Sequence, residues 1–148
     1  MNLKAYGVAG ILSIILLFPA PAQAMAFLDF AKMNNDDEAT YVSLLIEGAA
    51  KMLQMHGQPD QARKTLELFK DTGPHSGVKQ LALQMKRLNA INDRNAINPN
   101  NRAPVYQVED AMALTLKDNG IIVPVSYLLT VNQNFVPVGP SRGILNGP

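Results

Sequence analysis

Hydrophobic residues recur at helical spacing in several stretches, and the longest stretch follows a run of acids. In residues 35–57, polar positions three or four apart alternate with an opposite apolar set, as in an amphipathic α-helix. Asp36, Asp37 and Glu38 stand where the helix dipole favours acids, and Gly57 stands where a helix commonly ends. The apolar side is so wide that we predict this helix to be the most buried. It comprises Tyr41, Val42, Leu44, Leu45, Ile46, Gly48, Ala49, Ala50, Met52, Leu53 and Met55.

Two more helices follow the same logic. Pro59 suits the first turn of a helix, and Gly73-Pro74 ends it. Ser76 is an N-cap for the next helix, which we expect to reach Ile91. The residues predicted to face the core are Ala62, Thr65, Leu66, Leu68 and Phe69 in the first helix, and Val78, Leu81, Ala82, Met85 and Leu88 in the second.

The second half of the chain is less regular. Turn-forming residues fill positions 92–104, which predicts a long surface loop and one candidate binding surface. A helix follows from about Tyr106 to Asn119, capped by acids at its start and by Gly120 at its end. Residues 121–131 suit an edge strand or a helix, and we favour a short helix over 124–134. Residues 25–34 suit a short amphipathic arm.

These elements predict an all-α protein, a single-domain bundle of four to five helices with an irregular Pro/Gly-containing C-terminal tail. The expected organisation is a signal peptide at 1–24, a helical domain at 25–135 and a flexible tail at 136–148. The length of 148 residues is that of one domain.

The first 24 residues have the form of a secretory leader. Lys4 precedes an apolar stretch from Val8 to Phe18, which is too short to span a membrane, and Ala22-Gln23-Ala24 is a small-residue cleavage site. We therefore expect cleavage after Ala24 and a periplasmic or secreted protein, with no integral membrane segment after cleavage.

The amino-acid composition excludes some kinds of site and partner. The absence of cysteine excludes disulfides, thiolate metal sites and cysteine nucleophiles. The chain has thirteen basic and twelve acidic residues, and Lys4 lies in the leader, so the mature chain has twelve of each. A neutral chain is a poor partner for nucleic acid, and we expect none.

No catalytic motif is present. His56 and His75 are the two histidines, and neither lies in a known hydrolase or phosphate-binding motif. Glu109 and Asp110 are adjacent, so a helix directs them apart and we interpret them as first-turn acids that favour the dipole. Glu47 fits a solvated face with Lys51. We expect no enzymatic activity, no catalytic residues and no cofactor.

One weak metal motif stands out. Met52, Met55 and His56 place two thioethers and an imidazole at the end of one predicted helix, and such soft ligands suit copper. The alternative is that both methionines are core filler and that His56 favours the helix C-terminus.

The start of the predicted domain resembles the first helix of small periplasmic immunity proteins of type VI secretion. The resemblance lies in Asp36-Asp37-Glu38, Tyr41 and Glu47-Gly48-Ala49-Ala50, and it implies an all-helical protein that blocks a toxin by binding it. It covers one helix and carries over no site residues. The chain is also similar in size and helicity to periplasmic acid-stress chaperones, although both families commonly carry cysteines that this chain lacks.

We expect an exported helical protein that binds another protein of the cell envelope, such as an inhibitor, immunity protein or envelope adaptor. The partner surface could be the loop at 92–104 or the tail. The alternatives are a copper or small-ligand binding protein and an acid-stress chaperone-like protein.

Overall fold

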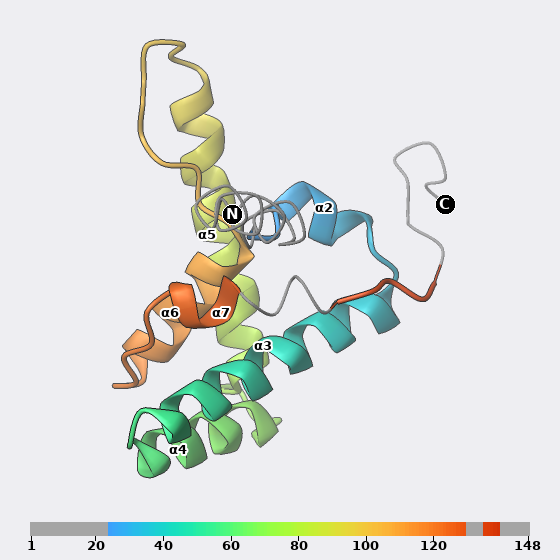
Figure 1. Ribbon diagram of the computed structural model, residues 1–148. Coiled ribbons are helices and arrows are strands. Elements are labelled where there is room, and N and C mark those ends of the chain that lie inside the picture. The colour runs from blue at the N-terminus through green and yellow to red at the C-terminus, as the bar shows by residue number, and fades with distance from the viewer. Residues whose placement is uncertain (1–23, 130–134, 140–148) are drawn as a thin grey trace, which may run out of the picture.

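The computed structural model describes residues 24–129 and 135–139, and all regular structure in this part of the chain is helical (Figure 1). Four helices are long and two, α2 and α7, are short. This confirms the predicted all-α bundle. The helices are α2 (Phe27–Lys32), α3 (Asn35–Met55), α4 (Pro59–Lys70), α5 (Gly77–Ala96), α6 (Val108–Asp118) and α7 (Ser126–Leu129).

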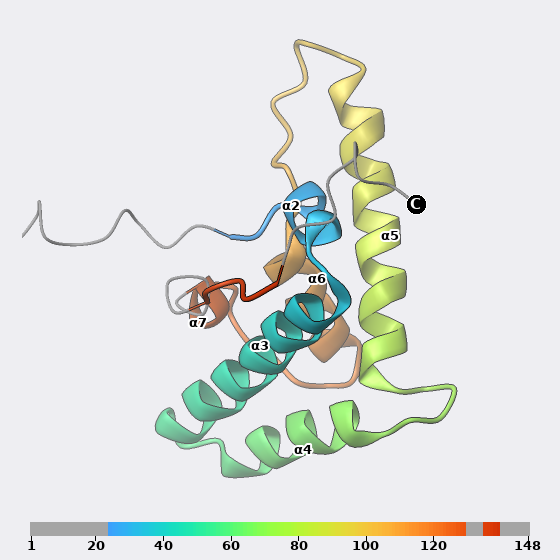
Figure 2. The same ribbon diagram turned by 90° about the vertical axis from the view of Figure 1, so that its right-hand side faces the viewer.

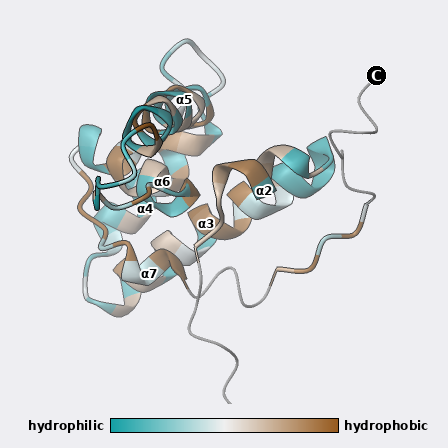
Figure 3. Cartoon of the chain, turned by 90° about the horizontal axis from the view of Figure 1, so that it is seen from above, coloured by the Kyte–Doolittle hydropathy of each residue, from teal (hydrophilic) through white to brown (hydrophobic). Residues whose placement is uncertain are grey.

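The bundle consists of two packed helix pairs. α3 packs chiefly on α4, and α5 packs chiefly on α6, while α7 lies against α3. Figures 1 and 2 show that α5 rises steeply from the end of α4 and that its C-terminal half extends past the other helices. Seen from above, α5 is nearly end-on and carries both hydrophobic and hydrophilic residues around its circumference (Figure 3).

The predicted helix ends are confirmed where capping is local. The Asn34 side chain accepts a hydrogen bond from the Asp37 N–H at the start of α3. Gly57 and Gly120 follow α3 and α6 with φ of +76° and +77°, a conformation that glycine adopts without strain. Pro59 begins α4, and the Ser76 hydroxyl caps α5.

A surface loop was predicted at 92–104, but its predicted start is wrong, because α5 continues to Ala96. The side chain of Asn92 reaches across to the Tyr106 backbone, accepting from its N–H at 2.8 Å and donating to its carbonyl at 2.8 Å. These two hydrogen bonds join the segment before α6 to α5. The Asn92 side chain, which by its type favours a turn, is engaged in them instead. The side chains of Asn98 and Asn101 each accept from a backbone N–H two residues on, so the remaining loop is built from tight turns.

The end of the chain is described in part. The short helix favoured at 124–134 is observed at Ser126–Leu129, and residues 130–134 lie outside the described residues. Residues 136–139 are irregular, as predicted for the tail, and the flexibility expected of 136–148 stays a prediction. The N–H groups of Val138 and Gly139 donate to the carboxylate of Asp37, which is only 4% exposed.

The core contains residues from every helix except α2, together with Met25 and Met33 on either side of it. Phe27 and Phe30 pack against this core, as predicted for an amphipathic arm. Within the described residues, no helix is long and apolar enough to cross a membrane. The largest fully buried apolar side chains are Tyr41, Leu45, Leu53, Leu88, Val108, Met112, Leu116, Ile121 and Leu128.

The predicted core stripes are wrong at some positions. Leu81 and Leu88 of α5 are buried, but Val78 of the same stripe is 52% exposed. In α4, Leu66 is 39% exposed, while Ala62 and Thr65 are buried. The apolar stripe of α5 is therefore wider than the part that α6 covers.

Candidate functional site

The uncovered part of the α5 stripe forms one wall of an apolar groove of about 540 Å³. Val78, Leu81, Ala82 and Met85 follow one another at helical spacing on this wall. The opposite wall is α3, whose lining residues lie within a stretch of twelve positions, about 16 Å along the helix. Phe30 from α2 and Phe69 from α4 complete the lining. The residues of the α3 wall are Asn35, Glu38, Ala39, Val42, Ser43 and Ile46.

Close packing at the start of α5 sets the shape of this groove. A Cβ atom at Gly77 would lie 2.8 Å from the ring of Phe69, so glycine allows the aromatic ring of α4 to rest on the backbone of α5. Ala39 and Ala82, on opposite walls, are exposed. The groove is thus open along its walls and does not close over a small molecule.

The groove offers apolar contact and little chemistry. Among the described residues that line it, the polar side chains come from α3 alone, and Glu38 is the one ionisable group. General acid and base catalysis needs at least one positioned titratable group beside the reacting atoms, and usually two. The arrangement therefore suits binding of an apolar surface.

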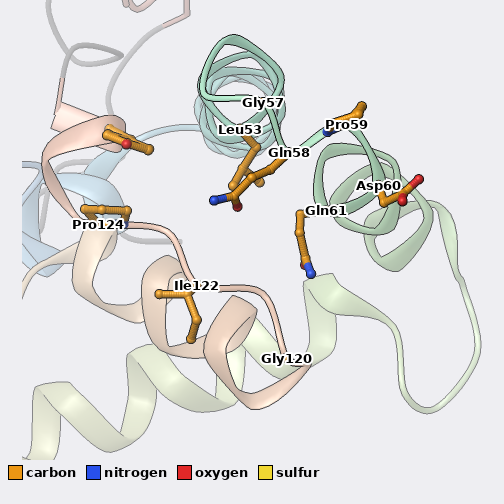
Figure 4. Close-up of a pocket in the computed structure, with 10 residues that line it drawn as sticks. Leu53, Gly57, Gln58, Pro59, Asp60, Gln61, Gly120, Ile122 and Pro124 are labelled. Atoms are coloured by element: carbon orange, nitrogen blue, oxygen red, sulfur yellow. The ribbon is translucent and has the colours of Figure 1, made fainter.

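A second cavity of about 630 Å³ lies where the α3–α4 turn meets the segment after α6 (Figure 4). Leu53 of α3, Gln58 of the turn and Gln61 of α4 line one side, and Ile122 and Pro124 line the other. The Oε1 atom of Gln61 is buried without a hydrogen-bond partner in the part of the chain that the structure describes. Among the described residues that line this cavity, Asp60 is the one carboxylate, and it is exposed.

The predicted metal ligands lie at the end of α3, next to this second cavity. Met52 is half-buried, whereas Met55 is 68% exposed and His56 is exposed. The ring of His56 stacks on Tyr127 with the ring centroids 4.7 Å apart. Met55 is therefore not core filler. In residues 24–129 and 135–139, no three histidine, aspartate or glutamate side chains form a group that could hold a metal ion, and the thioether site stays a prediction.

The most unusual electrostatic feature is a buried pair between α3 and α6. Tyr41 and Glu109 are both fully buried, and the tyrosine hydroxyl donates a hydrogen bond to Oε1 of the carboxylate. Burial raises the pKa of both groups, and the hydrogen bond to Glu109 raises that of Tyr41 further. Phe30 and Phe135 contact the tyrosine ring edge-on, at centroid distances of 6.3 and 5.0 Å.

Glu109 lies in the first turn of α6, as predicted, but its carboxylate is buried in the core, which was not predicted from the sequence. Asp110 does cap α6, accepting from the Gln107 N–H at 2.8 Å. The burial of Glu109 could have been predicted from its spacing. Met112 and Leu116 lie three and seven positions further on, so the three side chains share one face of the helix. Glu47, interpreted as solvated, is exposed as expected.

In comparisons with known proteins, no family model, curated protein or solved structure matches this chain. The class that fold and site define is thus an all-α bundle with an apolar groove between two of its helices. Its function is argued from this geometry.

Proposed function

We propose that this protein is exported to the periplasm or secreted and there binds another protein of the cell envelope through the groove between α3 and α5. The occupant is an amphipathic helix of the partner. The observation that carries the proposal is the α5 stripe, which has the periodicity of a core face but leaves Val78 52% exposed. The leader expected at residues 1–24 supports the compartment.

A helix fits this groove better than other occupants do. Both walls are helices, and their side chains form ridges at spacings of three and four residues, which is the surface into which a third helix packs. Helix-in-groove recognition uses apolar anchors one and two turns apart. The half-buried residues Val42, Ile46 and Met85 supply matching contacts along both walls.

Site-specific photocrosslinking tests the proposal. A photoreactive amino acid is placed at Ala39 on one wall, at Ala82 on the other, and at Leu83 as a matched control. Leu83 neighbours Ala82 but points about 100° away around α5, and it is 69% exposed. We expect the same partner protein in adducts from Ala39 and Ala82, and a yield at least tenfold lower from Leu83.

The outcomes separate the competing functions. Adducts from Leu83 but from neither wall would place the interface elsewhere and overturn the groove. The absence of any adduct, with the protein produced and folded in the envelope, would overturn protein binding through this surface. Many unrelated adducts whose yield rises in acid would instead indicate the chaperone alternative.

Copper binding at Met52, Met55 and His56 is the second candidate function, favoured by the 68% exposure of Met55. Thioether and imidazole ligands suit Cu(I). Titration of the protein with Cu(I) against a competing chelator should show one ion per chain, and Met55→Leu should weaken binding at least tenfold. Met112→Leu is the matched control because Met112 is fully buried on α6. If the protein takes up no more Cu(I) than a reference protein that does not bind copper, this second function is wrong.

A further inference from the structure

The backbone of Met25 is held at both of its polar groups by the first turn of α6. Its N–H donates to Oε2 of Glu109 at 2.8 Å, and its carbonyl accepts from the Val108 N–H at 2.9 Å. Met25 is 9% exposed and Glu109 is fully buried. A residue 84 positions away in the sequence is therefore fixed against a buried carboxylate.

The buried carboxylate of Glu109 has no cationic partner among the described residues. Its partners in the part of the chain that the structure describes are neutral: the Met25 N–H, the Tyr41 hydroxyl and the backbone N–H of Glu109 itself. An ionised carboxylate in the core is costly unless a cation pairs with it. The described ion pairs, formed by Arg63 with Asp60 and Glu67, lie on the exposed face of α4.

The sequence supplies a cation at this point by an independent route. The Ala22-Gln23-Ala24 motif predicts cleavage of the Ala24–Met25 bond. Hydrolysis by a signal peptidase consumes one water, leaves a carboxylate on Ala24 and leaves an amino group on Met25. That group takes up a proton, since the ordinary pKa of an α-amino group is about 7.7 to 8.0.

We propose that Glu109 is the binding site for the α-ammonium group formed on Met25 by this cleavage, so that removal of the leader completes the core with a buried ion pair. The nitrogen that becomes charged is the atom that already lies 2.8 Å from Oε2. Pairing therefore requires no movement of α6. The half-buried Ala24 departs with the leader and leaves room for the other N–H bonds of the ammonium group to reach water.

The pH dependence of stability follows from the same groups. In the uncleaved chain, burial raises the pKa of Glu109, and the neighbouring Asp110 raises it further, against the hydrogen bonds from Tyr41 and Met25. A raised pKa means that the folded chain binds this proton more tightly than the unfolded chain does. That stability is complete below the ordinary pKa of about 4.5 and is lost as the pH rises through the raised value. In the cleaved chain, the ammonium group of Met25 would stabilise the ionised carboxylate, so this loss of stability at higher pH would not occur.

The test compares two forms of the protein: one released from a tag so that Met25 is first, and one that keeps two extra residues before Met25. We expect the Tm of the Met25-first form at pH 7 to be about 10 °C higher, in line with the loss of a buried ion pair. Glu109→Gln should remove this advantage and change the extended form much less. Leu53→Ala is the control, because this buried residue lies on α3 about three turns from Tyr41 and should lower both forms equally.

Two measurements decide the outcome without relying on the variants. The Tm difference between the wild-type forms should shrink as the pH is lowered from 7 toward the ordinary carboxyl pKa of about 4.5. Mass spectrometry of the exported protein should find Met25 first. Equal Tm values for the two wild-type forms, equal effects of Glu109→Gln in both, or cleavage at another bond would overturn the proposal. None of these results depends on the α3–α5 groove, so failure here is distinct from failure of the proposed binding function.

Discussion

Tyr41→Ala should lower the free energy of unfolding by about 5 kcal/mol, a third or more of the stability of a typical domain. The side chain is fully buried, and its ring contacts Phe30 and Phe135 edge-on. Truncation leaves a large cavity and also leaves Oε1 of Glu109 without its hydroxyl donor, which adds the cost of an unsatisfied buried acceptor. Urea unfolding followed by circular dichroism measures the change.

Tyr41→Phe is the matched variant, because it keeps the ring and removes only the hydroxyl. We expect a loss of about 1 to 3 kcal/mol from the unpaired carboxylate oxygen. Equal losses in the two variants would show that the hydrogen bond, and not the ring packing, dominates the contribution of this residue.

Leu88→Ala should cost about 3 to 4 kcal/mol, the second largest effect expected. Leu88 is 1% exposed and lies in α5, which packs chiefly on α6. Removing its branched side chain leaves a cavity in the packed interior. The urea midpoint should fall while the dependence on denaturant stays unchanged.

Leu83→Ala provides the control on the same helix. Leu83 is 69% exposed, so its truncation should change stability by no more than about 0.5 kcal/mol. Because both variants replace leucine with alanine on the same helix, the difference between their stabilities reports the effect of burial and not of helix propensity. A comparable loss at both positions would contradict the observed orientation of α5.

The helix ends could be predicted because their causes are local. Gly57, Pro59, Ser76 and Gly120 each act within one turn of the helix that they start or end. The end of α5 could not be predicted in the same way. Asn92 favours a turn by itself, but here its side chain bonds to Tyr106, fourteen positions away, and the helix continues.

The candidate sites were less visible in the sequence. Periodicity shows that Val78 and Ala82 share an apolar face, but it does not show which part of the face another helix covers. The burial of Glu109 depends on partners 84 and 68 positions away, and its register alone hinted at it. The binding of Asp37 by the tail has no local signal at all.

The long-range hydrogen bonds give the protein a particular order of completion during synthesis. A chain emerges N-terminus first, yet Met25 and Tyr41 must wait for Glu109, and Asp37 must wait for donors 101 and 102 positions downstream. The α3–α4 hairpin can form early from nearby contacts, whereas closing such long loops is slow. The contacts of residues 25–41 are therefore among the last to form, and this part of the protein stays incompletely folded until residues 138 and 139 have been made.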